Sequence, residues 1–158
     1  MSKEDRKYIL IIFFLSIVSF FSNLWVKSAD LMEARNFITA REMVQSGNWL
    51  IPTLNGNLRF EKPPFPTWIT AGMMKIFHNT TDEYLLRIPV AVISVMLIFL
   101  IYYLVKLLTE KSFYSFITSF VALSTFMIIK TGNENSWDMY CYVFAFGAVV
   151  FLVSGMKK

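Results

Sequence analysis

The sequence predicts an all-α integral membrane protein with about four transmembrane helices and one long, partly helical extracytoplasmic loop. The first observation is composition, because 56% of the 158 residues are hydrophobic and 16 are Phe, more than a small soluble chain can bury. The second is that four apolar segments each approach the roughly 17–25 residues that a helix needs to cross the hydrocarbon core. They are residues 8–25, 88–108, 113–129 and 139–156. None alternates in polarity like a barrel strand, so helices, which pair their own backbone groups, are favoured.

The first segment has a second interpretation, because Lys3, Arg6 and Lys7 precede it as they would precede a signal peptide. Its apolar run, however, exceeds the ~7–15 residues of a signal core, and no small-x-small cleavage site follows Trp25. A transmembrane span is therefore favoured.

Orientation follows from Lys and Arg in the short segments beside the spans. Basic residues flank the first span, the turn between the second and third, and the end of the fourth: Lys3, Arg6, Lys7, Lys106, Lys111, Lys157 and Lys158. An even number of spans places these groups on one side, which the positive-inside rule assigns to the cytoplasm. Both termini are then predicted to be cytoplasmic, and the loop of residues 26–87 lies outside with the short loop of residues 130–137.

The sequence of the first half of the long loop predicts a capped helix followed by a turn. Asp30 and Glu33 fit a capping box at the start of a helix over residues 31–46, and Gly47 is its expected stop. Residues 48–59 are expected to be extended, with a turn at Asn55-Gly56.

The second half of the loop approaches the membrane. Prolines 63, 64 and 66 break a helix and then permit a new start. Residues 67–77 are apolar but too short to cross, so a helix lying at the interface is expected. A second capping box, from Thr80 to Glu83, leads into the second span.

Five carboxylates lie near the predicted outer face: Asp30, Glu33, Glu61, Glu134 and Asp138. Asp138 opens the fourth span, and acids at a membrane boundary are candidates for function. A structural explanation is equally open, since a helix N-terminus favours an acid. Glu33 has the capping box as its structural explanation.

The corner Glu61-Lys62, held before Pro63-Pro64, is the second candidate site. Glu61 is suited to bind a divalent cation or accept a proton, and Lys62 to pair with phosphate. A solvated loop ion pair is the alternative. Arg35, Arg59 and Arg87 have the forked donors that grip a phosphate, although lipid headgroups would also satisfy them.

Several function classes are disfavoured by the sequence. The net charge of +4 is spread out rather than clustered, which does not indicate a nucleic-acid partner, whereas membrane lipids suit cations at span boundaries. His78 is the single histidine, so a zinc site with several imidazoles is impossible. The sequence has no Gly-rich phosphate loop, Cys pair or nucleophile elbow.

The loop resembles the first periplasmic loop of GT-C membrane glycosyltransferases of the aminoarabinose transferase and protein mannosyltransferase type. The matching runs are Met32-Glu33-Ala34-Arg35, Ala40-Arg41-Glu42-Met43, Gly47-Asn48-Trp49, Pro52, Leu54-Asn55-Gly56, Phe60-Glu61-Lys62-Pro63-Pro64, Arg87-Ile88-Pro89 and Asp138-Met139. The resemblance extends from about Asp30 to the end of the chain, and the Glu-Lys-Pro-Pro run is its most specific part.

The resemblance implies an enzyme of the bacterial inner membrane that takes a sugar from a polyprenyl-phosphate donor. The acceptor would be lipid A, a protein or another glycan. Lys62 would face the donor phosphate, with Arg59, Arg35 and Arg87 as further phosphate ligands. Glu61 would help to hold a divalent metal cation or the acceptor. Asp138 would be a second metal ligand and an acidic residue of the catalytic site.

The chain departs from the family pattern in two ways. The family has an acid, its candidate catalytic base, where this sequence has Met32, so Asp30 or Glu33 would have to serve instead. Family members also have many more spans, so the chain is expected to be the N-terminal part of such an enzyme.

Two other functions stay open on the sequence. One is a non-catalytic small membrane protein that binds lipid phosphates or a partner through the long loop. The other is a transporter subunit, which is disfavoured because no charged residue lies deep in any predicted span.

Overall fold

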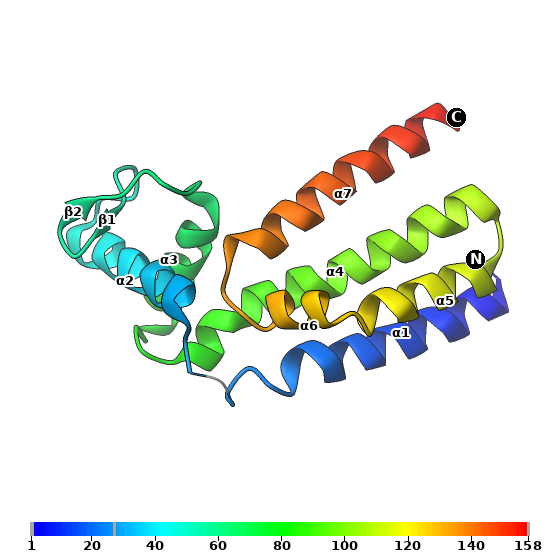
Figure 1. Cartoon of the computed structure of the whole chain (residues 1–158), viewed down its shortest axis with the longest axis horizontal. Coiled ribbons are helices and arrows are strands. Elements are labelled where there is room, and N and C mark those ends of the chain that lie inside the picture. The colour runs from blue at the N-terminus through cyan, green and yellow to red at the C-terminus, as the bar shows by residue number, and fades with distance from the viewer. Residues whose placement is uncertain (1, 27, 158) are drawn as a thin grey trace.

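The computed structural model describes residues 2–26 and 28–157, so the orientation argument from Lys158 and the loop position Lys27 lie outside the described residues. Helices α1 (Lys3–Phe21), α4 (Glu83–Thr109), α5 (Ser112–Leu123) and α7 (Trp137–Met156) form a bundle in which α4 contacts the other three (Figure 1). The short helix α6 (Phe126–Gly132) connects α5 to the loop before α7.

A small unit built from the long loop sits at one end of this bundle (Figure 1). It contains α2 (Leu31–Ser46), α3 (Phe65–Phe77) and the antiparallel strands β1 (Thr53–Leu54) and β2 (Asn57–Leu58). The first turn of α1 and the last turn of α7 lie at the opposite end, where the turn between α4 and α5 also lies. The arrangement therefore separates a loop-derived end from an end that carries most of the flanking Lys and Arg residues.

The all-α prediction holds for the described residues apart from the two short strands, and the prediction of four spans is supported in part. Helices α4 and α7 are long and apolar enough to cross a membrane, and α5 with α6 makes a third candidate if the bent pair is one span. Helix α1 does not qualify, because the run Lys3–Lys7 in its first turn is entirely charged and the helix ends at Phe21 rather than at residue 25.

The predicted third span, residues 113–129, is broken rather than straight. Helices α5 and α6 meet at an angle of 68°. The hydroxyls of Ser124 and Thr125 both donate to the carbonyl of Val121, at 2.9 and 3.0 Å. These side chains satisfy a carbonyl at the end of α5, which makes the break tolerable in an apolar environment. Apolar composition alone hides such a break.

The structure confirms the helix predicted at residues 31–46 of the long loop and corrects both predicted capping boxes. Helix α2 has the predicted bounds, and Gly47 ends it at a φ of 72°, a left-handed value that suits glycine. Asp30 caps α2 by accepting from the amides of Met32 and Glu33, but the Glu33 side chain does not complete the capping box. The second capping box is also wrong, because α4 begins at Glu83 with Asp82, not Thr80, as its cap.

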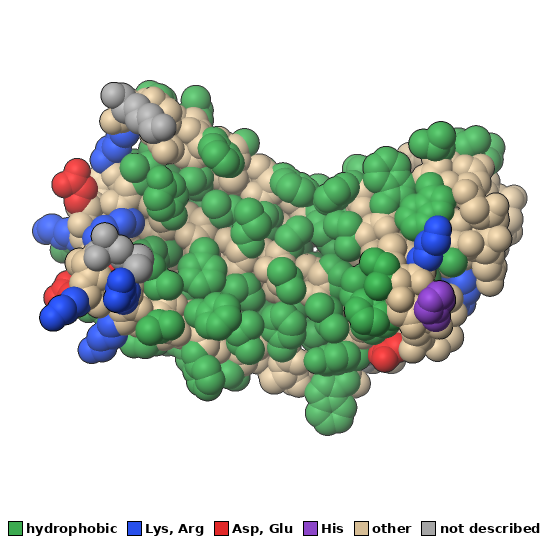
Figure 2. All heavy atoms as spheres, turned by 180° about the vertical axis from the view of Figure 1, so that it is seen from behind, with side chains coloured by type: hydrophobic (Ala, Val, Ile, Leu, Met, Phe, Trp, Pro, Cys, Tyr) green, Lys and Arg blue, Asp and Glu red, His purple; other side chains and the backbone are tan. Residues whose placement is uncertain are grey.

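The surface is divided in the way that a membrane protein requires. Figure 2 shows hydrophobic side chains across the middle of the molecule, with Lys, Arg, Asp and Glu side chains gathered towards the two ends. Large apolar residues on α1, α4, α5 and α7 are exposed, among them Phe14, Val92, Phe113 and Phe151. Exposed apolar surface of this extent is what a lipid environment accommodates and water does not.

Gly132 marks a close approach of α6 to α1 and α4. A Cβ at this position would lie 2.6 Å from the ring of the fully buried Phe20 and 2.8 Å from Oγ of Ser94. We expect Gly132→Ala to lower the free energy of unfolding by about 1–3 kcal/mol, because packed side chains must shift to admit the methyl group.

Thermal unfolding of the detergent-solubilised protein measures this effect, with Gly147→Ala as the matched control. The nearest atom to a Cβ at Gly147 is Leu100 Cδ1 at 3.8 Å, an ordinary contact. Equal melting temperatures for the two variants would show that the close packing of α6 is wrong.

Candidate functional site

The corner that follows the hairpin is positioned by α2. The carboxylate of Glu42 accepts hydrogen bonds from the hydroxyl of Thr53 and, at 3.5 Å, from the amide of Gly56. The amide of Arg59 donates to the carbonyl of Pro52 at 2.9 Å. Asn55 and Gly56 both adopt positive φ, as the two-residue turn requires. The fold of the hairpin therefore fixes where the chain enters the corner at Arg59.

Arg59 carries a buried and incompletely compensated positive charge. The residue is 6% exposed, and its Nη1 donates to the carbonyl of Arg35 and to Oγ1 of Thr39, both at 2.9 Å. Its Nε and Nη2 make no hydrogen bond within the described part of the chain. The nearest carboxylate, Glu61, lies 3.9 Å from Nε and has a side chain that is 70% exposed.

The pKa of Arg59 is lowered by its surroundings. Burial is the main cause, the neighbouring Arg35 lowers the pKa further, and the Glu61 carboxylate raises it. Arginine nevertheless keeps its proton at neutral pH. A buried cation without full compensation is unfavourable, so an anion that approaches the corner is stabilised there.

Trp137, the first residue of α7, joins this cation to a second one. Its indole ring lies 5.1 Å from Cζ of Arg59 and 5.8 Å from Nζ of Lys62, measured to the ring centroid. Its Nε1 donates to the carbonyl of Pro63 at 3.1 Å. Lys62 and Asp138, the residue after Trp137, are exposed. We call Arg35, Arg59, Lys62 and Trp137 the cationic corner.

The corner leaves little internal space. The cavity between its side chains has a volume of about 10 Å³, roughly the room that one water molecule needs. A ligand larger than a water molecule would therefore have to meet the corner from the exposed side, where Lys62 lies.

An apolar groove begins at the same corner. It is lined by Pro63, Phe65, Pro66, Trp137, Tyr140, Cys141 and Phe144 and has a volume of about 260 Å³. The ring of Phe65 contacts those of Tyr140 and Phe144 edge to face. The groove includes Trp137 of the cationic corner and Pro63, the residue after Lys62, and its surface is apolar.

Glu33 and Arg87 form a separate, buried junction. They are 0% and 1% exposed, and the guanidinium meets the carboxylate through two bonds of 2.9 Å. Arg87 also donates to the carbonyl of Leu24 at 2.6 Å and to Glu83 at 3.0 Å, and the amide of Asn135 donates to Glu33 at 2.6 Å. The pair thus ties α2 and α4 to the chain after α1 and to the loop before α7.

The structure brings only some of the predicted site residues together. Arg35, Arg59, Glu61 and Lys62 meet at the corner, and Asp138 adjoins it through Trp137. Glu33 and Arg87 instead face one another, and Asp30 serves as the α2 cap. Met32, at the position where the family has an acid, is exposed.

Sequence reasoning missed Trp137 and Thr39. Thr39 could not be predicted as a partner of Arg59, because a threonine within an amphipathic helix does not by itself indicate a site residue. Trp137 had one signal, an indole at a membrane boundary, but aromatic residues there are common.

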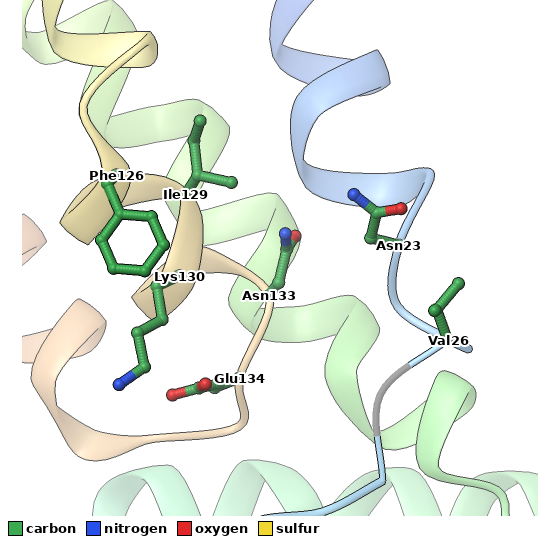
Figure 3. A pocket seen from close by; sticks show the side chains of 7 residues that line it. All are labelled: Asn23, Val26, Phe126, Ile129, Lys130, Asn133 and Glu134. Atoms are coloured by element: carbon green, nitrogen blue, oxygen red, sulfur yellow. The ribbon is translucent and has the colours of Figure 1, made fainter.

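A second pocket lies away from the corner, between the end of α1 and α6 (Figure 3). It has a volume of about 290 Å³ and is lined by Asn23, Val26, Phe126, Ile129, Lys130, Asn133 and Glu134. No predicted site residue lines it except Glu134, which was named only among the acids near the outer face.

The metal prediction is not tested by the geometry. No group of three or more His, Cys, Asp or Glu side chains converges in residues 2–26 and 28–157. A divalent cation at Glu61 and Asp138 therefore stays a prediction, and no chemical step is derived through it.

Comparison with solved structures identifies the architecture. The chain superimposes on the crystal structure of ArnT from Cupriavidus metallidurans bound to undecaprenyl phosphate, with a TM-score of 0.80 and 22% identity over 93% of this chain. The apo structure of the same protein gives a TM-score of 0.81. Each match covers 27% of the ArnT chain, and at this identity the likeness shows the fold alone.

The sequence comparison decides the family. Residues 61–158 match the family model described as dolichyl-phosphate-mannose-protein mannosyltransferase. The chain belongs to this mannosyltransferase family. The recognition of a GT-C transferase from the loop motifs is thereby confirmed, and membership together with membrane-length helices makes the chain an integral membrane protein.

Several curated relatives of this mannosyltransferase family member are named as arabinosyl transferases. The undecaprenyl phosphate-alpha-4-amino-4-deoxy-L-arabinose arabinosyl transferase 2 of Proteus mirabilis is 34% identical over 67% of this chain and 19% of its own length. Transferase 1 of the same organism is 31% identical over 77% of this chain and 22% of its own length. The chain thus spans about a fifth of the length of these relatives.

Proposed function

We propose that the chain is part of a membrane glycosyltransferase that moves a sugar from a polyprenyl-phosphate donor to a lipid, protein or glycan acceptor at the extracytoplasmic face. The observation that carries the proposal is the buried Arg59 guanidinium, which lacks full compensation and lies beside the exposed Lys62. The names of the arabinosyl transferases favour an undecaprenyl phosphate carrier with 4-amino-4-deoxy-L-arabinose as the sugar.

The cationic corner supplies what the donor phosphate needs. Lys62 is exposed and contacts the phosphate directly in this proposal, while Arg59 and the half-buried Arg35 add positive charge behind it. When the sugar leaves, negative charge accumulates on the phosphate, and fixed cations stabilise that charge. Arg87 is buried and ion-paired, so we assign it to positioning rather than to phosphate binding.

The apolar groove explains why the donor would be lipid-linked. A phosphate held at Lys62 places the first part of its polyprenyl chain at Pro63 and Trp137, where the groove opens. Aromatic residues of α3 and α7 then cover apolar chain that would otherwise contact water.

Asp138 is our choice for the carboxylate base. It is exposed, lies in the first turn of α7 and follows the tryptophan that contacts Lys62. It takes the proton of the acceptor hydroxyl as that oxygen attacks the anomeric carbon, and the bond from this carbon to the phosphate oxygen breaks. Such a single displacement inverts the anomeric centre. Glu33 is ion-paired and Asp30 caps α2, so both fit a base less well.

We further propose the membrane arrangement expected from the sequence, with four spans in a bacterial inner membrane and both termini cytoplasmic. In this arrangement α1 crosses together with the turn that follows it, and α5 with α6 forms one bent span. The corner, the groove and Asp138 then lie at the extracytoplasmic face.

The test is sugar transfer by the full-length membrane protein from undecaprenyl phosphate-linked aminoarabinose to lipid A. We expect transfer by the wild type and a loss of about 100-fold or more in Lys62→Ala, the size typical for removing a transition-state donor. Lys75→Ala is the matched control, because this exposed lysine also lies 5.8 Å from a tryptophan ring, that of Trp49. If the Lys62→Ala and Lys75→Ala variants transfer sugar equally well, the assignment of Lys62 to the donor phosphate is wrong. Absence of transfer by the wild type from any polyprenyl-phosphate sugar would favour the non-catalytic lipid-phosphate-binding protein.

A further inference from the structure

We propose that Trp137 is a positioning residue that holds the Lys62 and Arg59 side chains in place to bind the donor phosphate. The inference rests on the proposed function and adds to it a residue that contacts no reacting atom.

Three contacts fix the ring. Trp137 is 4% exposed, which prevents the ring from rotating into solvent. Its Nε1–H bond to the carbonyl of Pro63 anchors the residue directly after Lys62. Its indole ring lies within cation–π distance of both Lys62 and Arg59, at 5.8 and 5.1 Å. One side chain on α7 thus contacts both cations and the backbone of the corner.

An aromatic ring suits this position better than an acid would. Lys62 and Arg59 repel one another, and each needs a partner to stay in place. A carboxylate between them would hold them but would cancel their charge and repel a phosphate. The electron-rich face of an indole attracts both cations and leaves their net charge available to the ligand.

The position of Trp137 also relates the corner to the proposed base. Trp137 and Asp138 are consecutive residues at the start of α7, whereas Arg59 and Lys62 belong to the long loop. The contacts of the ring therefore fix the phosphate-binding cations relative to the carboxylate. Without the ring, Lys62 and Arg59 would no longer be held where the donor phosphate lies beside the base, which weakens binding of the donor.

Steady-state kinetics of the full-length protein test the inference with two variants. Trp137→Leu removes both cation–π contacts and the Nε1 bond, and we expect the KM for the lipid-linked donor to rise about tenfold or more. Trp137→Phe keeps a ring but not the bond, so its donor KM should lie between wild type and Trp137→Leu. The KM for the acceptor should stay within about twofold of wild type, since the acceptor does not contact these cations in the proposal.

Trp49→Leu and Trp49→Phe are the matched controls. The ring of Trp49 also lies near a lysine, Lys75, and its carbonyl accepts a bond from the indole of Trp68, but neither contact involves the corner. A merely structural tryptophan would change the melting temperature without a selective rise in donor KM, so both quantities are measured for all four variants.

The outcomes separate this inference from the proposed function. A donor KM that is unchanged in both Trp137 variants, with activity lost in Lys62→Ala, would overturn the positioning role and leave the function standing. Equal rises in donor and acceptor KM would likewise overturn it. If Lys62→Ala is also fully active, the proposed function itself is wrong. Should Trp137→Leu fail to fold, an unchanged donor KM in Trp137→Phe alone overturns the inference, and a selective rise supports it.

Discussion

Arg87→Met should lower the free energy of unfolding by about 3–5 kcal/mol, because removing one partner of a buried ion pair strands the other charge. The stranded group is the Glu33 carboxylate, which is fully buried and keeps its hydrogen bond from the backbone amide of Asn135. The junction also holds the chain after α1 through the carbonyl of Leu24. Denaturant or thermal unfolding in detergent measures the loss.

Arg41→Met is the matched control for this prediction. Arg41 is half-buried on α2, and its Nη2 donates a hydrogen bond of 2.9 Å to the backbone carbonyl of Thr80. Its replacement should lower the free energy of unfolding by about 1 kcal/mol, the net value of an ordinary hydrogen bond.

The double variant Glu33→Gln with Arg87→Met should recover part of the stability lost in Arg87→Met, since no buried charge is left behind. Equal losses for Arg87→Met and Arg41→Met would mean that the buried junction does not exist.

Asp138→Asn should lower kcat for sugar transfer by about 10²–10⁴-fold while the KM for the donor changes little. The amide is nearly isosteric with the carboxylate but does not accept the proton of the acceptor hydroxyl. Because Asp138 is exposed at the end of α7, its replacement should leave the melting temperature close to wild type.

Glu110→Gln is the control for charge removal alone. This exposed carboxylate ends α4 at the turn to α5, at the end of the bundle opposite the loop-derived unit. It should retain wild-type kcat. If Asp138→Asn keeps kcat within a few-fold of the control, Asp138 is not the base, and Glu33 and Asp30 return as candidates.

Local features of the fold could be predicted because their causes lie within a few residues. Asp30 and Gly47 bound α2 through a cap and a left-handed stop, and both act on backbone groups of the same helix. Asn55-Gly56 forms its turn for a similarly local reason. The break at Ser124 escaped prediction because the residues around it are apolar on both sides, and only the hydroxyl bonds reveal it.

The site could be predicted in part for the same reason. Lys62 and Asp138 were found from a proline-bounded corner and a span boundary, both readable along the chain. The partner of Glu33 was not, because Arg87 lies 54 residues away and the capping-box interpretation supplied a sufficient local role. Trp137 contacts the corner only once α7 has packed beside the loop, so its relation to Arg59 exists in three dimensions alone.

The central claim is that the cationic corner binds a lipid-linked phosphate, and equilibrium binding of undecaprenyl phosphate to the purified protein in lipid nanodiscs tests it most directly. Undecaprenol, which has the same chain without the phosphate, and the Lys75→Ala variant serve as controls. We predict that Lys62→Ala raises the Kd for undecaprenyl phosphate about tenfold or more, as expected for the loss of a charge-assisted contact, whereas Lys75→Ala does not change it. A Kd for undecaprenyl phosphate that is the same in wild type and Lys62→Ala, or no tighter than that for undecaprenol, would contradict the account.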